Sequence, residues 1–486
     1  GDMVVVEITR FPTGTRGAIG RVLEVLGDID APGVDTEVII RKYGIPDVHP
    51  PEVVEEARRL GASVSERDLA GRSDFRGLTI VTIDGEHERD FDDAISVERL
   101  PGGHFRLGVH IADVSHYVAE GSALDESAYE RGTSVYFPER AVHMFPSELA
   151  TGLCSLNPHV DRLVQSCFLE IDGHGNVARA DFADGIIHSR ARMTYTEVNS
   201  ILTDPGSPAR ETYRELVPTF ELFHEVFVAL STARRKRGSI DFDLNETEVV
   251  VNEGGLIEAI IALERNVAHR LIEEFMLAAN EAVAAFLDAA GTPALYRVHE
   301  EPDPQRVEKF EDFIAGFDLS LGVPLNAVEP RHFQKLLARI HGKPAERPIA
   351  FLMLRTMQKA RYATEDLGHF GLATAHYTHF TSPIRRYPDL VVHRALRAAR
   401  HDGTSALLRS DVAAGVRDGE EAEPDELSDV ARHTSEMERR ADDAERELLQ
   451  WKKVKFMADK VGDEFDGYVT GVAAFGLFVE IVEPYV

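Results

Sequence analysis

The sequence of 486 residues contains only two cysteines and a single tryptophan. Cys154 and Cys167 provide neither a disulfide framework nor the paired spacing of a zinc site, so we expect a chain that works in a reducing, cytoplasmic compartment. No uninterrupted apolar run approaches the roughly 20 residues that a membrane helix needs. The sequence therefore argues against a membrane-spanning segment, and we expect no membrane partner.

Basic residues are also scarce, with 53 lysines and arginines against 83 aspartates and glutamates, which gives a net charge of −30. This charge opposes broad electrostatic attraction to nucleic acid. A nucleic-acid partner would have to bind in a groove, beside local basic clusters such as 234–237 and 385–386. Neither a Ser-His-Asp signature nor a glycine-rich phosphate loop is evident, so we expect no covalent acyl chemistry and no nucleotide cofactor.

What the chain does have is a dense run of carboxylates in residues 83–94, at Asp84, Asp90, Asp92 and Asp93. Carboxylates this close repel one another and resist ionisation, and a bound cation removes the conflict. Oxygen ligands that leave room for water and phosphate suit Mg²⁺. The run fits a metal-assisted phosphodiester site, but by spacing alone it fits a solvated acidic turn equally well. An EF-hand loop is excluded, because apolar residues occupy two of its required positions.

Hydrophobic patterning gives a coarse plan of the chain. Residues 3–9 and 18–26 are expected to form a hairpin, 52–60 a short helix, and 94–99 with 105–111 a second hairpin that places the aspartates at a strand's leading edge. Long helices are expected over 264–287 and over 429–460, the latter after an N-cap at Ser428. Two further strands are expected at 464–469 and 477–481. Both ends therefore resemble pieces of β barrels around a large central domain.

Three further segments, 110–115 (HIADVS), 133–138 (TSVYFP) and 379–389 (HFTSPIRRYPD), lie in order with the aspartate run. Together the four motifs closely resemble the ribonuclease II/ribonuclease R (RNB) family of exoribonucleases, and the stretches 154–158 (CSLNP) and 385–388 (RRYP) resemble its ribonuclease R branch. The resemblance implies an α+β fold with a large mixed α/β RNB catalytic domain between partial all-β OB-fold domains. The corresponding boundaries are 1–45 for a cold-shock-type OB domain, 46–75 for a linker and short helix, 76–400 for the catalytic domain, 401–461 for a helical extension and 462–486 for the start of a C-terminal RNA-binding OB domain.

The resemblance also implies an activity, namely processive, Mg²⁺-dependent hydrolysis of single-stranded RNA from the 3′ end, which yields nucleoside 5′-monophosphates and a short end product. One or two Mg²⁺ ions are expected, with Mn²⁺ as a substitute, and the chain is expected to act as a monomer. Carried over residue by residue, the metal ligands are Asp84, Asp90, Asp92 and Asp93. The catalytic residues are Asp92 and Arg385, and the RNA-binding residues are Tyr136, Tyr195, Phe242, Glu273, Arg385 and Arg386.

Several of these residues also have ordinary structural explanations. Tyr136 and Tyr195 would otherwise be half-buried aromatics, and Phe242 alternates with acidic neighbours as in a common strand. Glu273 lies four residues after His269, a spacing typical of a helix-stabilising pair. We retain Glu273 as a candidate and leave His269 out.

His110 and Asp113 are left out of the predicted site as well, since a strand histidine near an aspartate fits a buried structural network. Two alternatives remain for the whole chain. One is an RNA-binding protein of the same fold without catalysis, and the other is a metal-dependent nuclease that acts on other phosphodiesters.

Overall fold

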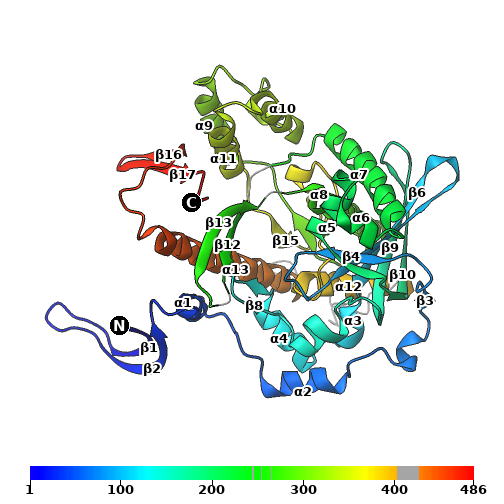
Figure 1. Ribbon diagram of the computed structural model, residues 1–486, viewed down its shortest axis with the longest axis horizontal. Helices are drawn as coiled ribbons and strands as arrows, with labels where there is room; N and C mark the ends of the chain where they lie inside the picture. Colours follow the sequence, from blue (N-terminus) through cyan, green and yellow to red (C-terminus); the bar gives the residue numbers. More distant parts are fainter. Residues whose placement is uncertain (243–245, 253, 264, 402–425) are drawn as a thin grey trace, which may run out of the picture.

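A seven-stranded sheet forms the centre of the computed structural model, which describes residues 1–242, 246–252, 254–263, 265–401 and 426–486 (Figure 1). Its central strands are antiparallel, and a strand at each edge pairs in parallel. In spatial order the strands are β11 (Ala191–Thr194), β4 (Val81–Asp84), β5 (Asp93–Arg99), β6 (Phe105–Ala112), β9 (Asp161–Ile171), β10 (Val177–His188) and β3 (Ser73–Asp74).

The predicted hairpin around residue 102 is confirmed as β5 and β6, in a register that pairs Asp93 with Ile111. Gly102 and Gly103 both adopt positive φ in the turn, which glycine tolerates without steric cost. Because β6 is buried on both faces, it anchors the leading edge of β5, where the acidic run ends. The mixed class of helices and strands expected from the sequence is confirmed.

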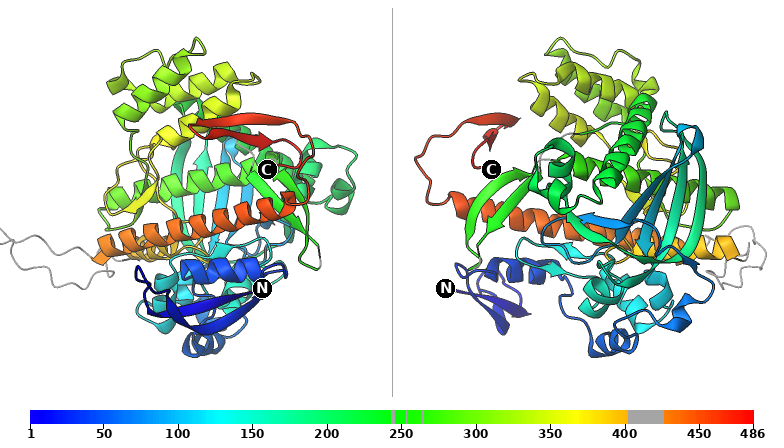
Figure 2. Two further views of the ribbon diagram at one scale, coloured as in Figure 1. Left: turned by 90° about the vertical axis from the view of Figure 1, so that its left-hand side faces the viewer. Right: turned by 45° about the vertical axis from the view of Figure 1, so that its right-hand side comes forward.

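Helices cover the sheet and connect its strands (Figures 1 and 2). The helix predicted over 264–287 is confirmed but begins later, at Val267, because the Asn266 side chain caps it by accepting from two backbone N–H groups. It packs against β6 and β9 and against neighbouring helices, and so forms part of the main core. The helices are α1 (Val34–Tyr43), α2 (Pro51–Arg59), α3 (Val114–Tyr117), α4 (Ala123–Arg131), α5 (Tyr195–Thr203), α6 (Pro208–Thr212), α7 (Val217–Arg237), α8 (Val267–Ala290), α9 (Pro304–Ala315), α10 (Pro330–Ile340), α11 (Glu346–Thr356), α12 (Tyr387–His401) and α13 (Glu426–Met457).

The long helix α13 crosses the molecule between α1 on one side and α9–α11 on the other (Figure 2). It already includes Ser428, so the predicted N-cap there is wrong. Residues 402–425 of the predicted helical extension lie outside the described residues. Helices α9, α10 and α11 have a small hydrophobic core of their own, which also includes Ile240 and Phe370.

Paired strands outside the main sheet form short hairpins and ladders. The predicted terminal hairpins are both present, with small shifts at their ends. The pairs are β1 (Asp2–Arg10) with β2 (Ile19–Asp28), β7 (Val135–Tyr136) with β8 (Ala141–Val142), β12 (Glu246–Val251) with β13 (Ile257–Leu263), β14 (Tyr296–Val298) with β15 (Arg361–Ala363), and β16 (Gly467–Ala473) with β17 (Gly476–Ile481).

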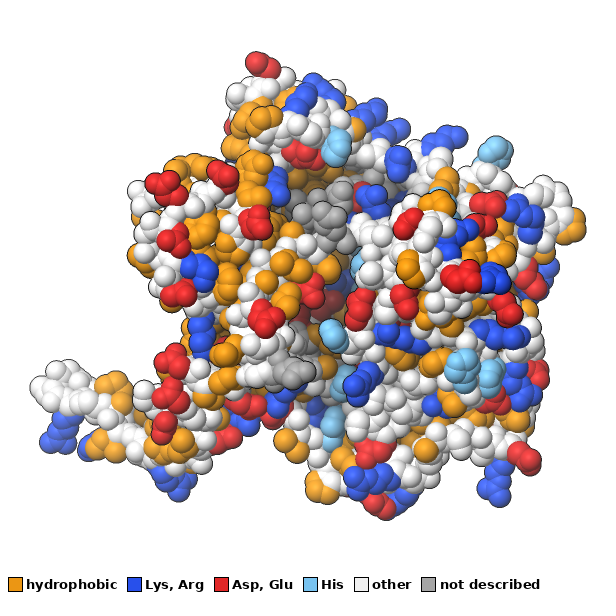
Figure 3. Space-filling view, viewed as in Figure 1, with side chains coloured by type: hydrophobic (Ala, Val, Ile, Leu, Met, Phe, Trp, Pro, Cys, Tyr) orange, Lys and Arg blue, Asp and Glu red, His pale blue; other side chains and the backbone are white. Residues whose placement is uncertain are grey.

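Surface composition differs between the main body and the terminal hairpins (Figure 3). Lysine and arginine side chains are interspersed with carboxylates over the body, whereas hydrophobic side chains gather over β16 and β17. Among the described residues, no helix combines the length and the apolar character needed to cross a bilayer.

Candidate active site

The four motif aspartates lie where β4 ends and β5 begins. Asp84 is the last residue of β4 and Asp93 the first of β5, and the loop between these neighbouring strands contains Asp90 and Asp92. The Ser155 side chain holds this loop through two hydrogen bonds. Its hydroxyl accepts from Phe91 N at 3.0 Å and donates to the carbonyl of Arg89 at 2.7 Å. The structure therefore explains why the 154–158 segment accompanies the acidic run.

Burial makes ionisation of these carboxyl groups unfavourable in the absence of a cation. Burial raises the pKa of Asp84 well above its ordinary value, and the charges of Asp93 and Glu88 raise it further. The pKa of Asp92 is also raised by burial, although Arg385 opposes the shift. The same two effects leave the pKa of Asp93 at about 7. A cation held among these groups would reverse the shifts.

Two carboxylate oxygens in this cluster suit a metal ion. Asp84 Oδ2 and Asp92 Oδ2 are buried, and the structure gives neither a hydrogen-bond partner. Leaving such oxygens unsatisfied is costly, and a cation would satisfy both. Within the described chain, the one group of three candidate ligands whose atoms all lie within 4.8 Å of one another is elsewhere, at Asp288, Asp366 and His376. No three of the four motif aspartates therefore bring carboxylate oxygens that close together in the described chain.

Arg385 lies in the turn before α12 and faces the cluster. Its Nε is 3.8 Å from Asp92 Oδ2, and its Nη2 donates to Ser382 Oγ at 3.0 Å. Ile384 N donates to the other oxygen of Asp92 at 2.8 Å, and Ser134 N donates to the carbonyl of Arg385 at 2.9 Å. The turn is therefore held by both Asp92 and Ser134, while 41% of the Arg385 side chain stays accessible to solvent.

Arg386 has a different environment from its neighbour. Its Nε and Nη2 donate to the two oxygens of the fully buried Asp389, at 2.9 and 2.8 Å. Asp389 also accepts from Ser382 N at 2.8 Å, so the pair closes the turn that carries Arg385. The RNA contact of Arg386 stays a prediction, and the geometry favours a supporting role for this side chain.

Tyr136 contacts the acidic cluster directly. Its hydroxyl donates to Asp90 Oδ2 at 2.6 Å, and its backbone N–H donates to Glu445 Oε1 at 2.7 Å. The ring also meets His143 edge to face, at 6.4 Å between centroids. Burial raises the pKa of Tyr136 well above its ordinary value, so the phenol keeps the proton that it donates. The hydroxyl is desolvated among the carboxylates, whereas the residue as a whole is 38% exposed.

Tyr195 begins α5 beside the cluster and stacks on His269, with centroids 3.9 Å apart and planes 20° from parallel. His269 was left out on sequence grounds because its spacing to Glu273 suggested a helix contact. In the structure Glu273 instead pairs with Arg265, and His269 extends the aromatic surface of Tyr195. Only the tertiary contact between α5 and α8 reveals this pairing.

Phe242 and Glu273 lie on the wall of a cavity of about 500 Å³, whose lining includes none of the four motif aspartates. The cavity lies between α7, α8, α10, α11 and β17. Arg265 is also on its wall and pairs with Asp241 at 3.2 Å as well as with Glu273. Residues 239–242 are not a strand, so the ordinary-strand explanation of Phe242 does not hold for the described part of that segment, while Asp243 lies outside it.

Two further carboxylates near the cluster were missed by sequence reasoning. Burial and the neighbouring charge of Asp90 raise the pKa of Glu88, which lies within the acidic run but falls outside a pattern made of aspartates. Burial likewise raises the pKa of Glu445 to about 7. Glu445 comes from α13, 309 positions after Tyr136, and no local pattern points to it.

Comparison with known proteins agrees with this architecture. Residues 72–402 match the family described as RNB domain, and residues 1–50 match the cold shock domain. Ribonuclease R of Aquifex aeolicus is 43% identical over 100% of this chain and 67% of its own length, and that of Escherichia coli is 41% identical over 100% and 59%. The structure of Mycoplasma genitalium RNase R in complex with ribose methylated single-stranded RNA superposes on this chain with a TM-score of 0.90 at 29% identity. The superposition covers 100% of this chain and 74% of the Mycoplasma chain.

The chain thus spans between 59% and 67% of the length of those two curated relatives. The expected combination of a mixed central domain with a cold-shock-type OB segment is confirmed by the two family matches. The chain belongs to the RNB family, in its ribonuclease R branch.

Proposed function

We propose that the protein is a metal-dependent 3′-to-5′ exoribonuclease that hydrolyses single-stranded RNA processively to nucleoside 5′-monophosphates and a short end product. The observation that carries the proposal is that Arg385 faces Asp92, in a cluster where two buried carboxylate oxygens have no hydrogen-bond partner and suit a cation. The two curated relatives are named ribonuclease R, and the RNase R of Mycoplasma genitalium was solved with ribose methylated single-stranded RNA.

In this proposal Asp84, Asp90, Asp92 and Asp93 hold Mg²⁺, as one or two ions, with Mn²⁺ as a substitute. When bound, the metal would supply an activated water and charge stabilisation for the leaving oxygen. Glu88 adds a further carboxylate within the same loop.

Arg385 has the exposure and the planar fork needed to contact two oxygens of the scissile phosphate, and so to balance charge that grows in the transition state. Arg386, held by Asp389, keeps the turn in place. Tyr136 and Tyr195 would stack on the last nucleotides, contacts that tolerate any base. Phe242 and Glu273, on the cavity wall, would contact RNA further from the cut, with Glu273 reading a ribose hydroxyl.

We also propose that the chain acts as a monomer in the cytoplasm without a nucleotide cofactor. The domain boundaries proposed above, with the catalytic domain at 76–400, stand as part of this proposal. The acidic net charge supports binding of RNA within a confined path rather than on an open face.

The test uses a 5′-labelled single-stranded RNA and the matching DNA oligonucleotide, each incubated with Mg²⁺ or with EDTA. We expect one short RNA product with few intermediates in Mg²⁺, and intact RNA in EDTA. A metal-independent gel shift without cleavage would favour the RNA-binding alternative. Cleavage of DNA at the rate of RNA would favour a general phosphodiesterase and would remove the ribose contact from Glu273.

A further inference from the structure

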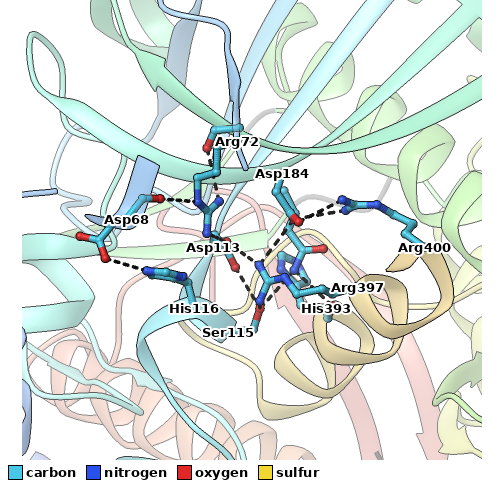
Figure 4. A network of polar contacts seen from close by, with 11 residues as sticks. Asp68, Arg72, Asp113, Ser115, His116, Asp184, His393, Arg397 and Arg400 are labelled. Carbon is cyan, nitrogen blue, oxygen red and sulfur yellow. Dashed lines mark hydrogen bonds and ion pairs between the residues drawn. The ribbon is translucent and has the colours of Figure 1, made fainter. Parts of the chain in front are cut away.

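A second polar cluster lies beyond the proposed site and contacts the helix that follows Arg385. Its central residue is Asp113, fully buried at the end of β6. Asp113 Oδ2 accepts from Arg72 Nη2 at 2.6 Å and from Arg397 Nη2 at 2.5 Å, and its Oδ1 accepts from Ser115 Oγ at 2.9 Å. Figure 4 shows these side chains converging from the segment before β3, from the end of β6 and from α12.

The cluster continues along α12. Arg397 Nη1 donates to Ser115 Oγ at 2.9 Å, and Arg400 donates to both oxygens of Asp184 on β10, at 3.2 and 3.0 Å (Figure 4). Earlier in the helix, His393 contacts the carbonyl of Phe380 at 2.7 Å. α12 is therefore fixed to the sheet through charged side chains on its later turns.

The same helix and the same strand meet again at Asp92. Ala112 N, next to Asp113 in the chain, donates to the carbonyl of Asp92 at 2.8 Å. Ile384 N, in the turn that leads into α12, donates to the carboxylate of Asp92 at 2.8 Å. β6 and α12 are therefore connected at two places. Asp92 contacts the end of β6 and the turn before α12, and the ion pair of Asp113 with Arg397 connects the end of β6 to a later turn of α12.

The neighbouring arginines keep the Asp113 carboxylate ionised, so its contact with Arg397 is an ion pair. Burial alone would raise the pKa of Asp113, but Arg397 and Arg72 outweigh it and hold the pKa well below its ordinary value. An ion pair with two cationic partners and a hydroxyl satisfies a buried carboxylate, whereas loss of one partner leaves an uncompensated charge. The contact of Asp113 with Arg72, Arg397 and Ser115 therefore has one favoured geometry.

We propose that Asp113 is a positioning residue, which acts through Arg397 to set the axial position of α12 and hence the placement of Arg385 against Asp92. The inference rests on the proposed function, in which Arg385 contacts the scissile phosphate. Asp113 itself lies outside the reacting groups, so its loss should lower kcat while RNA binding persists. A misplacement of about 1 Å in such a group can cost on the order of a hundredfold in rate.

The experiment compares Asp113→Asn with the matched control Asp35→Asn, at another buried aspartate with a cationic partner, in the wild-type and in the Arg385→Lys background. With wild-type Arg385, Asp113→Asn should lower kcat by roughly tenfold to a hundredfold with KM within about twofold. In the Arg385→Lys background it should cause no further loss, because the group that it positions is already gone. Asp35→Asn should lower the thermal midpoint but leave kcat within about twofold in both backgrounds, because its ion pair joins α1 to α13 and leaves α12 untouched.

A second pair of variants covers the case in which Asp113→Asn does not fold. Arg397→Lys keeps the charge but gives up the planar fork that reaches both Asp113 and Ser115. It should lower kcat several-fold. Arg76→Lys, at an arginine that pairs with Asp74 and Asp161 away from α12, should not. An unchanged kcat in Arg397→Lys, or losses that multiply fully with Arg385→Lys, would overturn the inference while the proposed function stands. A wild-type protein that does not hydrolyse RNA would overturn both.

Discussion

The central sheet and the terminal hairpins differ in what they bury. In the sheet region, carboxylates such as Asp84, Asp92 and Asp113 lie below the surface. In the terminal hairpins, by contrast, apolar side chains are exposed to solvent. Val25 of β2 is 61% exposed, and Phe475, at the β16–β17 turn, is 83% exposed. Burying charge is unfavourable unless something compensates it. Arg72 and Arg397 compensate Asp113, whereas Asp84 and Asp92 each keep an oxygen without a hydrogen-bond partner.

The difference suggests a division of roles. Chemistry that depends on preorganised charge requires a rigid, buried setting, which the sheet, the Arg385 turn and α12 supply. The hairpins present apolar and aromatic side chains at the surface, where they can contact an extended ligand but cannot stabilise a transition state. Changes in the sheet region should therefore alter rate or stability, and changes in the hairpins should alter affinity.

Asp92→Asn should have the largest effect, a loss of hydrolysis on the order of a thousandfold or more. The amide can still accept from Ile384 N through its oxygen, so the fold and RNA binding should persist. Product formation and a filter-binding assay on the same preparation check this. Asp181→Asn, at an exposed aspartate of β10 paired with Arg179, serves as the control. Loss of binding together with hydrolysis would mean that Asp92 supports the fold.

Acid should weaken the sheet region through His110, which is fully buried between Ser96 and Ser166. Burial lowers the pKa of His110 to about 3, whereas the unfolded imidazole titrates near 6.5. As pH falls below about 6.5, the unfolded state binds a proton that the folded state does not, so stability is lost progressively toward pH 3.

Urea unfolding at pH 7 and pH 5 measures this loss. His110→Gln should reduce the acid-induced decrease in the free energy of unfolding by about 2 kcal/mol, and His341→Gln, at a largely exposed histidine, should leave it unchanged. An equal decrease in wild type and His110→Gln would show that other groups account for the acid sensitivity.

Tyr136 combines a polar group that contacts the aspartate cluster with a ring that can stack on a base, and two substitutions test these parts separately. Tyr136→Phe keeps the ring but removes the hydrogen bond to Asp90, and should lower kcat about tenfold, since a hydrogen bond to a charged group is worth about 1.5–3 kcal/mol. The length of the end product should stay the same. Tyr136→Ala should in addition lengthen the end product, because the stacking surface is lost. A wild-type rate in Tyr136→Phe would remove the hydroxyl from the chemistry.

The smallest effect is expected in the β16–β17 hairpin. Phe475→Ala should weaken binding of single-stranded RNA by several-fold with kcat unchanged, because one exposed stacking face is removed. Phe313→Ala, at a partly exposed aromatic residue of α9, provides the comparison and should leave affinity as it is. A change in kcat with Phe475→Ala would contradict the division between sheet and hairpins.

The sequence anticipates features that depend on neighbours along the chain. The β5–β6 hairpin follows from alternation and a Pro-Gly-Gly turn, and the aspartate loop follows from a motif read within one run of residues. It does not anticipate pairings across long separations, such as Asp113 with Arg397, 284 positions apart. The sequence already ranked Arg385 above Arg386 as the catalytic arginine, but it did not anticipate the ion pair with Asp389, which forms when α12 brings Asp389 back onto Arg386.

The two cysteines offer a way to observe the sheet region on its own. Both thiols are buried beside or within the sheet, and burial raises the pKa of each, so neither ionises near neutral pH. Alkylating reagents should reach them only when this region opens, whatever the hairpins do. The labelling rate of the two native cysteines would therefore measure how often the sheet region opens. A cysteine introduced at a hairpin tip would be labelled independently of them and would measure the exposure of that tip.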